Sequence, residues 1–238
     1  MPEAFSRTQM LLGGEAMERL RRARVALFGL GGVGGYVLEA LLRSGVGALD
    51  LIDNDVITES NLNRQLLALR STLGMPKTEA AARRAADINP EAVIRCYPVF
   101  LTPENAASFC FADYDYVVDA IDTVTAKIEL VCRAQAAGVP ILSCMGTGNR
   151  LDPARLCITD LAGTAGCPLA RVMRKELRRR GVEHLKVLAS SEPPHVEEES
   201  GETKGNLGRP APGSVAFVPS VAGLMIAGEV IRELAGIN

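Results

Sequence analysis

The segment from residue 29 to residue 35 is rich in glycine and carries the pattern GxGxxG at Gly29, Gly31 and Gly34. Without side chains, backbone N–H groups can approach a phosphate closely, and the N-terminus of a following helix favours negative charge. Gly32 lies in the same turn and belongs to the predicted site. The next apolar run ends in Asp53, whose position along the chain suits a contact with ribose hydroxyls. The pattern indicates a nucleotide site.

Polar residues downstream indicate that the nucleotide is ATP rather than NAD. A dehydrogenase would account for the glycines and Asp53, but it gives no purpose to the cations that follow. An enzyme that displaces pyrophosphate needs cations, because charge moves onto the phosphoryl oxygens. In the first turn of a helix the dipole disfavours a lysine, so a ligand phosphate is its expected partner. The additional predicted ATP ligands are Asp55, Asn61, Arg64, Gln65 and Lys77, of which Arg64 and Lys77 are also candidate catalytic residues.

Asp122 follows a third feature, the apolar run from 117 to 121. A carboxylate at the end of a strand that faces phosphates is a natural ligand for Mg²⁺, and it makes Asp122 a candidate catalytic residue. The same residue could instead cap the N-terminus of the next helix. Both interpretations are open at this point.

Five β-rich runs alternate with helical patterns and must position these side chains. The alternation predicts an α/β fold: a Rossmann-like, doubly wound, mainly parallel sheet with helices on both faces. Gly31, Asp53 and Asp122 then lie at the carboxyl edge, where open sheets bind ligands. The predicted strands are 25–30, 49–52, 93–99, 116–121 and 140–144, and the predicted helices of this half are 36–43 and 76–88.

The C-terminal third has a different pattern. Segments 156–159, 186–189 and 215–218 resemble strands and form either a smaller antiparallel layer or an extension of the sheet edge, before a closing helix at 221–234. Residues 193–213 are rich in proline, glycine and charge, and are expected to be either a lid or plain disorder. We expect one domain over 1–238, with a nucleotide-binding half at about 20–150 and a substrate or lid part at about 151–238.

Composition excludes several classes of protein. The 238 residues carry a net charge of -2, which argues against a basic coat for nucleic acid but allows a local basic patch. No segment resembles a signal peptide or a membrane span, so we expect a soluble, cytoplasmic protein without a membrane partner. None of the six cysteines forms a CxxC pair, and we expect reduced thiols, with Cys96, Cys132, Cys144 and Cys157 buried.

The combination of GxGGxG, DxD, NxxRQ, GxPK and a strand-end aspartate resembles the ubiquitin-activating-enzyme superfamily over residues 5–146. The resemblance implies that Asp53 holds the ribose and that Asp122 serves Mg²⁺. It implies phosphate contacts from four residues: Asn61, Arg64, Gln65 and Lys77. By the same resemblance Arg7 is an N-terminal arginine that reaches the ATP of a partner subunit, which implies a homodimer.

Within this superfamily, the chain is most similar to the branch that dehydrates threonylcarbamoyladenosine, a modified adenosine next to the tRNA anticodon. Segments 143–148, 152–153, 190–194 and 212–219 carry the similarity. It implies adenylation of the threonyl carboxylate, ring closure, and release of AMP and pyrophosphate. The alternative is an adenylyltransferase for a ubiquitin-like sulfur-carrier protein, against which the missing CxxC pairs count. A nucleotide-binding module without catalysis is a third reading, and a sulfur-transfer protein is a possible partner.

A basic stretch offers a place for tRNA. Arg171, Arg174, Lys175 and Arg178 recur at helical spacing and share one face, while Val172, Met173 and Leu177 lie towards the other side. Phosphate contacts from such a face would weaken steeply with salt. A solvated face without a ligand is the alternative.

Overall fold

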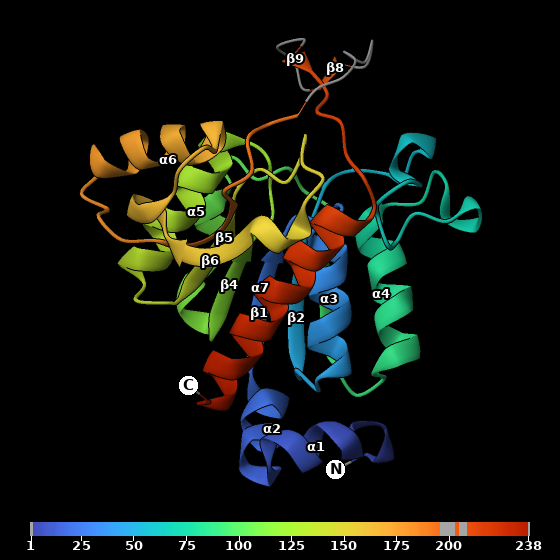
Figure 1. Ribbon diagram of the computed structural model, residues 1–238. Helices are drawn as coiled ribbons and strands as arrows, with labels where there is room; N and C mark the ends of the chain where they lie inside the picture. The colour runs from blue at the N-terminus through green and yellow to red at the C-terminus, as the bar shows by residue number, and fades with distance from the viewer. Residues whose placement is uncertain (1, 196–202, 205–208, 238) are drawn as a thin grey trace.

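The computed structural model describes residues 2–195, 203–204 and 209–237. Among these residues a seven-stranded sheet has the order β3-β2-β1-β4-β5-β7-β6, and only β6 runs antiparallel to its neighbour (Figure 1). A separate two-stranded ribbon, β8 with β9, lies beyond the carboxyl edge of the sheet. The strands are β1 Arg24–Phe28, β2 Ala48–Ile52, β3 Val93–Tyr97, β4 Tyr116–Asp119, β5 Ile141–Cys144, β6 Leu156–Asp160, β7 Lys186–Ser190, β8 Thr203–Lys204 and β9 Arg209–Pro210.

The central strands are short aliphatic runs because both of their faces are covered. Every residue of β4 and β5 is buried, whereas the edge strand β3 is mostly exposed or half-buried. The direction of the strand order reverses between β1 and β4, with β2 and β3 on one side and β5 on the other. This switch point is where open α/β sheets form a ligand crevice.

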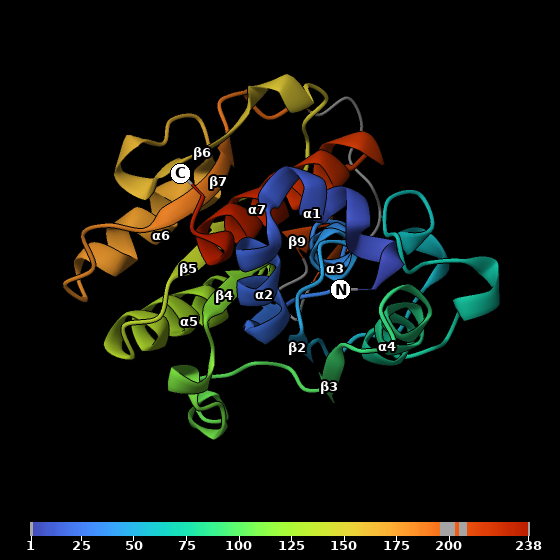
Figure 2. The ribbon, with the colours of Figure 1, turned by 90° about the horizontal axis from the view of Figure 1, so that it is seen from below.

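Helices cover both faces of the sheet and form two hydrophobic cores. One core packs α3 and α7 against the sheet, with α4 beside α3; the other packs α5 and α6 (Figure 2). Gly223 lets α7 approach α3, because a Cβ there would lie 2.4 Å from the carbonyl oxygen of Val33. The helices are α1 Ser6–Leu12, α2 Gly14–Arg22, α3 Gly34–Arg43, α4 Lys77–Ile88, α5 Val124–Ala136, α6 Pro168–Arg178 and α7 Phe217–Ala235.

The predicted α/β class, the mainly parallel sheet and the helices on both faces are confirmed. Strands β6 and β7 extend the sheet edge rather than forming a separate layer. The predicted strand at 215–218 is wrong: Phe217 begins α7, whose buried residues Val218, Ala222 and Ile226 repeat at helical spacing. Helices α1 and α2 were not predicted.

Two of the four cysteines predicted to be buried are exposed. The prediction that Cys96 and Cys157 are buried is wrong, because both residues lie on edge strands, β3 and β6, and are exposed. Cys144 is buried and Cys132 half-buried. Much of the predicted loop 193–213 lies outside the described residues. Within the described part of the chain, no helix is long and apolar enough to cross a bilayer.

Candidate functional site

A cavity of about 450 Å³ opens at the carboxyl edge of the sheet, at the switch point between β1 and β4. Its volume falls within the range of roughly 300–1,000 Å³ usual for small-molecule sites. The turn after β1 and the segments after β2, β3, β4 and β5 all contribute to its lining. The predicted residues that line it are Gly29, Gly31, Gly32, Asp53, Asp55, Asn61, Arg64, Gln65, Lys77 and Asp122.

The glycine turn between β1 and α3 can be built only from glycine at two places. Gly29 has a φ of 93°, and a Cβ on it would lie 2.7 Å from the carbonyl oxygen of Ala120. A Cβ on Gly34 would lie 1.8 Å from the carbonyl oxygen of Gly29. The turn therefore packs closely against the end of β4 and presents the backbone of Gly31 and Gly32 to the cavity at the start of α3.

Asp53 follows β2 and is held rigidly beside the glycine turn. Its carboxylate accepts hydrogen bonds from the backbone N–H of Leu30 at 2.6 Å and of Asp55 at 2.8 Å. The side chain is 8% exposed, and this burial raises its pKa above the ordinary value of 3.8. The ammonium of Lys77 and the two N–H groups oppose that shift in pKa. The two backbone hydrogen bonds therefore fix the Asp53 carboxylate at the cavity wall as a hydrogen-bond acceptor.

Lys77 is the first residue of α4 and is almost buried, with 6% of its side chain exposed. Its Nζ lies 2.6 Å from Oδ2 of Asp55 and 3.9 Å from Oδ2 of Asp53. The sequence predicted a ligand phosphate as its partner, and the structure shows two carboxylates in that place. Asp55 is 58% exposed, so a second anion has access to this cation from the cavity.

Arg64, Asn61 and Gln65 lie on the turns that follow β2. Arg64 Nη1 donates to the backbone oxygen of Ser60 and to Oδ1 of Asn63, both at 2.8 Å, which fixes the guanidinium beside the cavity. Asn61 Oδ1 accepts from the backbone N–H of Thr58 at 3.2 Å. Gln65 is 9% exposed, and its Oε1 has no hydrogen-bond partner among the described residues. A buried amide oxygen in this condition is costly unless a ligand or water satisfies it.

Asp122 is exposed and lines the cavity just beyond β4. Thr123 donates from Oγ1 to its Oδ1 at 3.4 Å. The N-cap position of α5 belongs to Thr123 and not to Asp122, so the capping alternative is wrong. Asp122 thus lines the same cavity as the glycine turn.

The predicted site residues leave out several parts of the wall, among them the segments that follow β3 and β5. Val99, Phe100 and Leu101 line the cavity after β3, and Phe100 is 49% exposed. Residues 144–148 line it after β5. The sequence could have predicted them, because both segments lie at the carboxyl ends of predicted parallel strands, and those ends must meet at this edge of the sheet.

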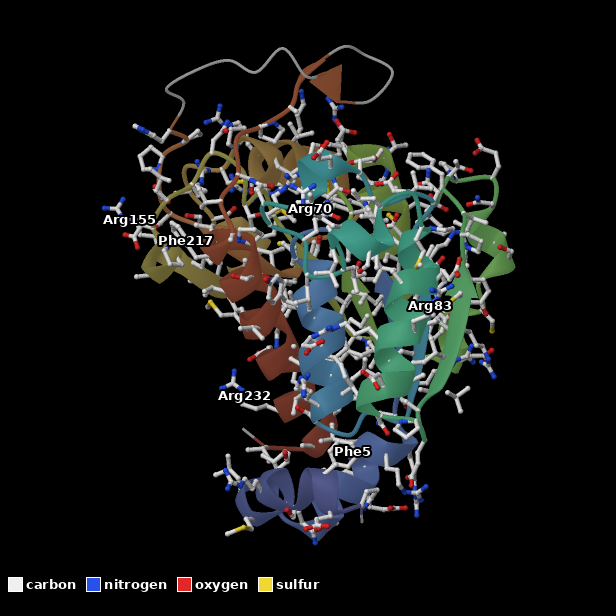
Figure 3. The ribbon with its side chains drawn as sticks, turned by 90° about the vertical axis from the view of Figure 1, so that its right-hand side faces the viewer. Phe5, Arg70, Arg83, Arg155, Phe217 and Arg232 are labelled. Atoms are coloured by element: carbon white, nitrogen blue, oxygen red, sulfur yellow. The ribbon has the colours of Figure 1, made fainter. Side chains whose placement is uncertain are left out.

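Arg7 does not join the cavity of its own chain. It is an exposed residue of α1, which lies at the opposite end of the sheet (Figure 1). Figure 3 labels its neighbour Phe5, buried at the junction with the sheet, while Arg70 lies near the carboxyl edge. A role for Arg7 at a nucleotide requires a second copy of the chain.

The basic face of α6 is smaller than predicted. Arg171, Lys175 and Arg178 are exposed. Arg174 is not part of the open face: its guanidinium donates to the backbone oxygens of Leu161 at 3.1 Å and Thr164 at 2.6 Å. Placing Val172 on the docked side is also wrong, because it is 44% exposed, whereas Ala170, Met173 and Leu177 form the buried side of the helix.

Comparison with known proteins gives the following similarities. The model of the ThiF family matches residues 5–238. The tRNA threonylcarbamoyladenosine dehydratase of Bacillus subtilis is 41% identical, over 98% of this chain and 95% of that protein. The sulfur carrier protein adenylyltransferase of Thermus thermophilus is 39% identical, over 56% of this chain and 50% of that protein. The crystal structure of Escherichia coli tRNA N6-threonylcarbamoyladenosine dehydratase in complex with ATP superposes with a TM-score of 0.89 at 31% identity, over 98% of this chain and 94% of that one.

Proposed function

The chain belongs to the ThiF family, and from this premise we propose that it is an ATP-dependent enzyme that dehydrates threonylcarbamoyladenosine in tRNA. Its relatives of nearly equal length carry this name, and the related structure named for the same activity binds ATP. The observation that carries the proposal for this chain is the cavity itself. It gathers an acceptor, two cations and a second carboxylate around a glycine turn: Asp53, Arg64, Lys77 and Asp122.

The reaction removes water in two steps. The threonyl carboxylate of the modified adenosine attacks the α-phosphorus of ATP, and pyrophosphate leaves to give an acyl-adenylate. A neighbouring group of the same modification then attacks the activated carbonyl, which closes a ring and expels AMP. The oxygen lost from the carboxylate leaves with AMP, so ATP cleavage drives the net loss of one water.

Four parts of the cavity have proposed roles in these two steps. Asp53 accepts hydrogen bonds from the ribose hydroxyls, because its carboxylate is fixed beside the start of α3. The backbone of Gly31 and Gly32 binds phosphate oxygens. Lys77 turns from the exposed Asp55 towards the phosphates, since ion pairs with exposed carboxylates are weak. Arg64 stabilises the charge that develops on the departing pyrophosphate.

Asp122 is the proposed contact for Mg²⁺. The described residues include no group of three or more His, Cys, Asp or Glu side chains that could hold a metal on their own. One accessible carboxylate fits a magnesium ion that arrives bound to the triphosphate, because Mg²⁺ commonly uses one or two carboxylates plus substrate phosphates. When bound, the ion would neutralise charge on the phosphate oxygens. Asp122 would orient it from the β4 side of the cavity.

Arg7 is proposed to act across a homodimer. The Arg7→Ala and Arg64→Ala variants should each lose nearly all adenylation, since an arginine at a phosphoryl group contributes about 10³–10⁵ in rate. Mixing the two variants should restore about a quarter of the wild-type activity, because half of the dimers are mixed and each has one intact site. ATP–pyrophosphate exchange measures this directly. Wild-type exchange in Arg7→Ala, or no recovery on mixing, would remove the role of Arg7.

The exposed face of α6 is the proposed contact for tRNA. Charge reversal in Lys175→Glu with Arg178→Glu should weaken tRNA binding about tenfold at low salt and lower the salt slope by about one per lost phosphate contact. Arg83→Glu on α4, on the far side of the sheet, is the matched control and should bind tRNA normally. Filter binding over a salt series compares them. Equal affinities and slopes in all three proteins would contradict the proposal.

One experiment tests the proposed function. The wild-type protein is incubated with ATP, Mg²⁺ and tRNA that carries threonylcarbamoyladenosine, and the nucleosides are analysed by mass spectrometry. We expect loss of one water from the modified nucleoside with stoichiometric AMP. AMP release that depends on a carrier protein ending in Gly-Gly, with unchanged tRNA, would instead support the sulfur-carrier alternative.

A further inference from the structure

A buried charged cluster lies beneath the β4 side of the cavity and has no part in the roles assigned above. Asp119 ends β4, Ser143 pairs with it on β5, and Lys127 comes from the start of α5. All three side chains are fully buried. Lys127 Nζ donates to Asp119 Oδ2 at 2.9 Å and to Ser143 Oγ at 3.3 Å, and Ser143 Oγ donates to Asp119 Oδ2.

A buried ion pair stabilises a core poorly, because the free energy needed to remove two charges from water is often larger than the free energy gained from their attraction. Apolar residues of similar volume can replace such a pair without loss of stability. The surrounding core offers such packing, because Val117, Val118 and Leu142 are completely buried on the same strands. Stability alone therefore does not account for the lysine and the aspartate.

The second carboxylate oxygen of Asp119 connects the cluster to the cavity wall. Asp119 Oδ1 accepts the backbone N–H of Ile121 at 3.2 Å, which ties down the segment 120–122 that lines the cavity and ends in Asp122. The backbone N–H of Ala120 donates to the oxygen of Phe28 at 2.8 Å, directly before the glycine turn. On β5, the residues that follow Ser143 line the cavity as well.

We propose that Lys127 is a positioning residue: through Asp119 and Ser143 it fixes segment 120–122, so that the carboxylate of Asp122 faces the phosphates. The proposal rests on the proposed role of Asp122 towards Mg²⁺ and ATP. Lys127 is fully buried and does not line the cavity, so it acts through the backbone rather than on the substrate. A hydrogen-bonded ion pair specifies one arrangement of the strand end, whereas apolar packing would accept several.

The test separates positioning from stability with two variants. Lys127→Met leaves Asp119 buried without its partner and should lower the Tm. The double variant Asp119→Leu with Lys127→Met removes both charges and should recover the wild-type Tm. In the double variant we expect kcat for ATP–pyrophosphate exchange to fall about 10²-fold, because small misplacements of catalytic groups have effects of this size. The KM for ATP should change little, and half-saturation with Mg²⁺ should need a higher concentration.

Hydrogen exchange supplies a readout that does not depend on activity. The amide of Ile121 should be protected in the wild type and exchange faster in the double variant. The matched control replaces another ion pair of the same sheet, Arg24–Asp50, in Arg24→Met with Asp50→Leu. Asp50 is 1% exposed and neither residue lines the cavity, so kcat, magnesium dependence and Ile121 exchange should stay at wild-type values.

The outcomes are distinct. A double variant with wild-type Tm, kcat, magnesium dependence and Ile121 exchange would overturn the positioning role. If the double variant has a lower Tm than the wild type, Ser143→Ala serves in its place, because it keeps the ion pair. It should show the same changes on a smaller scale. Unchanged kcat and unchanged Ile121 hydrogen exchange in Ser143→Ala would overturn the role equally. Failure of the wild type to exchange pyrophosphate would refute the proposed function instead, while the exchange rate of Ile121 would still test the positioning.

Discussion

Two aspartate–lysine pairs flank the cavity, one on each side of the switch point, and they are built from the same parts. In each, an aspartate lies at the end of a parallel strand and a lysine comes from the beginning of the next long helix. Asp53 directly follows β2 and Lys77 begins α4, whereas Asp119 ends β4 and Lys127 lies near the start of α5. The Lys77–Asp53 distance is 3.9 Å, and the Lys127–Asp119 distance is 2.9 Å.

The difference between the pairs is access to the cavity. Asp53 and Lys77 both line it, and Lys77 is shared with the exposed Asp55, so a ligand can compete for this cation. Asp119 and Lys127 are sealed from solvent and exchange hydrogen bonds only with their surroundings in the fold. Residues of the same types at equivalent places in the fold therefore receive different proposed roles: one pair is proposed to bind the ligand, and the other to hold the wall that faces it.

The largest effect should come from breaking the accessible pair. Lys77→Met removes the cation without leaving a cavity and should lower kcat for ATP–pyrophosphate exchange about 10²–10³-fold, the range seen when one charge-stabilising group is lost. Stability should fall less than in Lys127→Met, because the closer partner Asp55 is largely exposed and the buried Asp53 keeps its two backbone hydrogen bonds. Exchange kinetics and thermal unfolding measure the two quantities.

The two lysine variants should differ in which property they lose. Lys127→Met should show the opposite balance, with a marked loss of stability, since it strands a buried carboxylate. A Lys77→Met protein that unfolds early but exchanges pyrophosphate at the wild-type rate would make Lys77 a structural residue and would erase the contrast.

A smaller effect is expected from Asp53→Asn. Loss of the charged acceptor should raise the KM for ATP roughly 10- to 100-fold, since a hydrogen bond to a charged group contributes about 1.5–3 kcal/mol. Burial raises the pKa of Asp53, so its carboxylate is lost at a higher pH than that of an exposed aspartate. Acidification should therefore raise the wild-type KM as the pH falls through this raised pKa.

The same shift sets the sign of the effect on stability. A carboxyl group with a raised pKa in the folded state stabilises the protein at low pH, and that contribution is lost as the pH rises through its pKa. Asp53→Asn should therefore not destabilise the protein at neutral pH, and its KM should be independent of pH across the same range. A steep pH dependence of KM that persists in Asp53→Asn would assign the titration to another group.

The two pairs also show what the sequence could and could not predict. Asp53 and Lys77 were found because a glycine turn, a strand end and a helix start are local patterns, and parallel strands bring their ends to one edge. Asp119 lay inside a run predicted as strand, and Lys127 lies on a helix whose bounds were not predicted. Their contact depends on the register of Asp119 with Ser143, which pairs residues far apart in sequence.

The same limit explains the error at Arg174. Its spacing is that of an exposed basic face, but the backbone oxygens of the turn at residues 161–164 accept hydrogen bonds from its guanidinium. A tertiary contact, rather than a local preference, decides where this side chain lies.

The smallest effect is expected from Ser143→Ala, which tests most closely how the buried pair differs from the accessible one. The change removes the hydrogen bonds of Ser143 with Asp119 and Lys127 but leaves the ion pair in place, so the free energy of unfolding should fall by only about 0.5–1.5 kcal/mol for each bond. If the buried pair holds the wall by a connected network, kcat should still fall measurably while the KM for ATP stays constant. Ser143 does not line the cavity, so a direct effect on ATP is excluded. Urea unfolding and ATP–pyrophosphate exchange on the same preparation give both quantities, and a loss of stability without any change in kcat would reduce the sealed pair to a structural element.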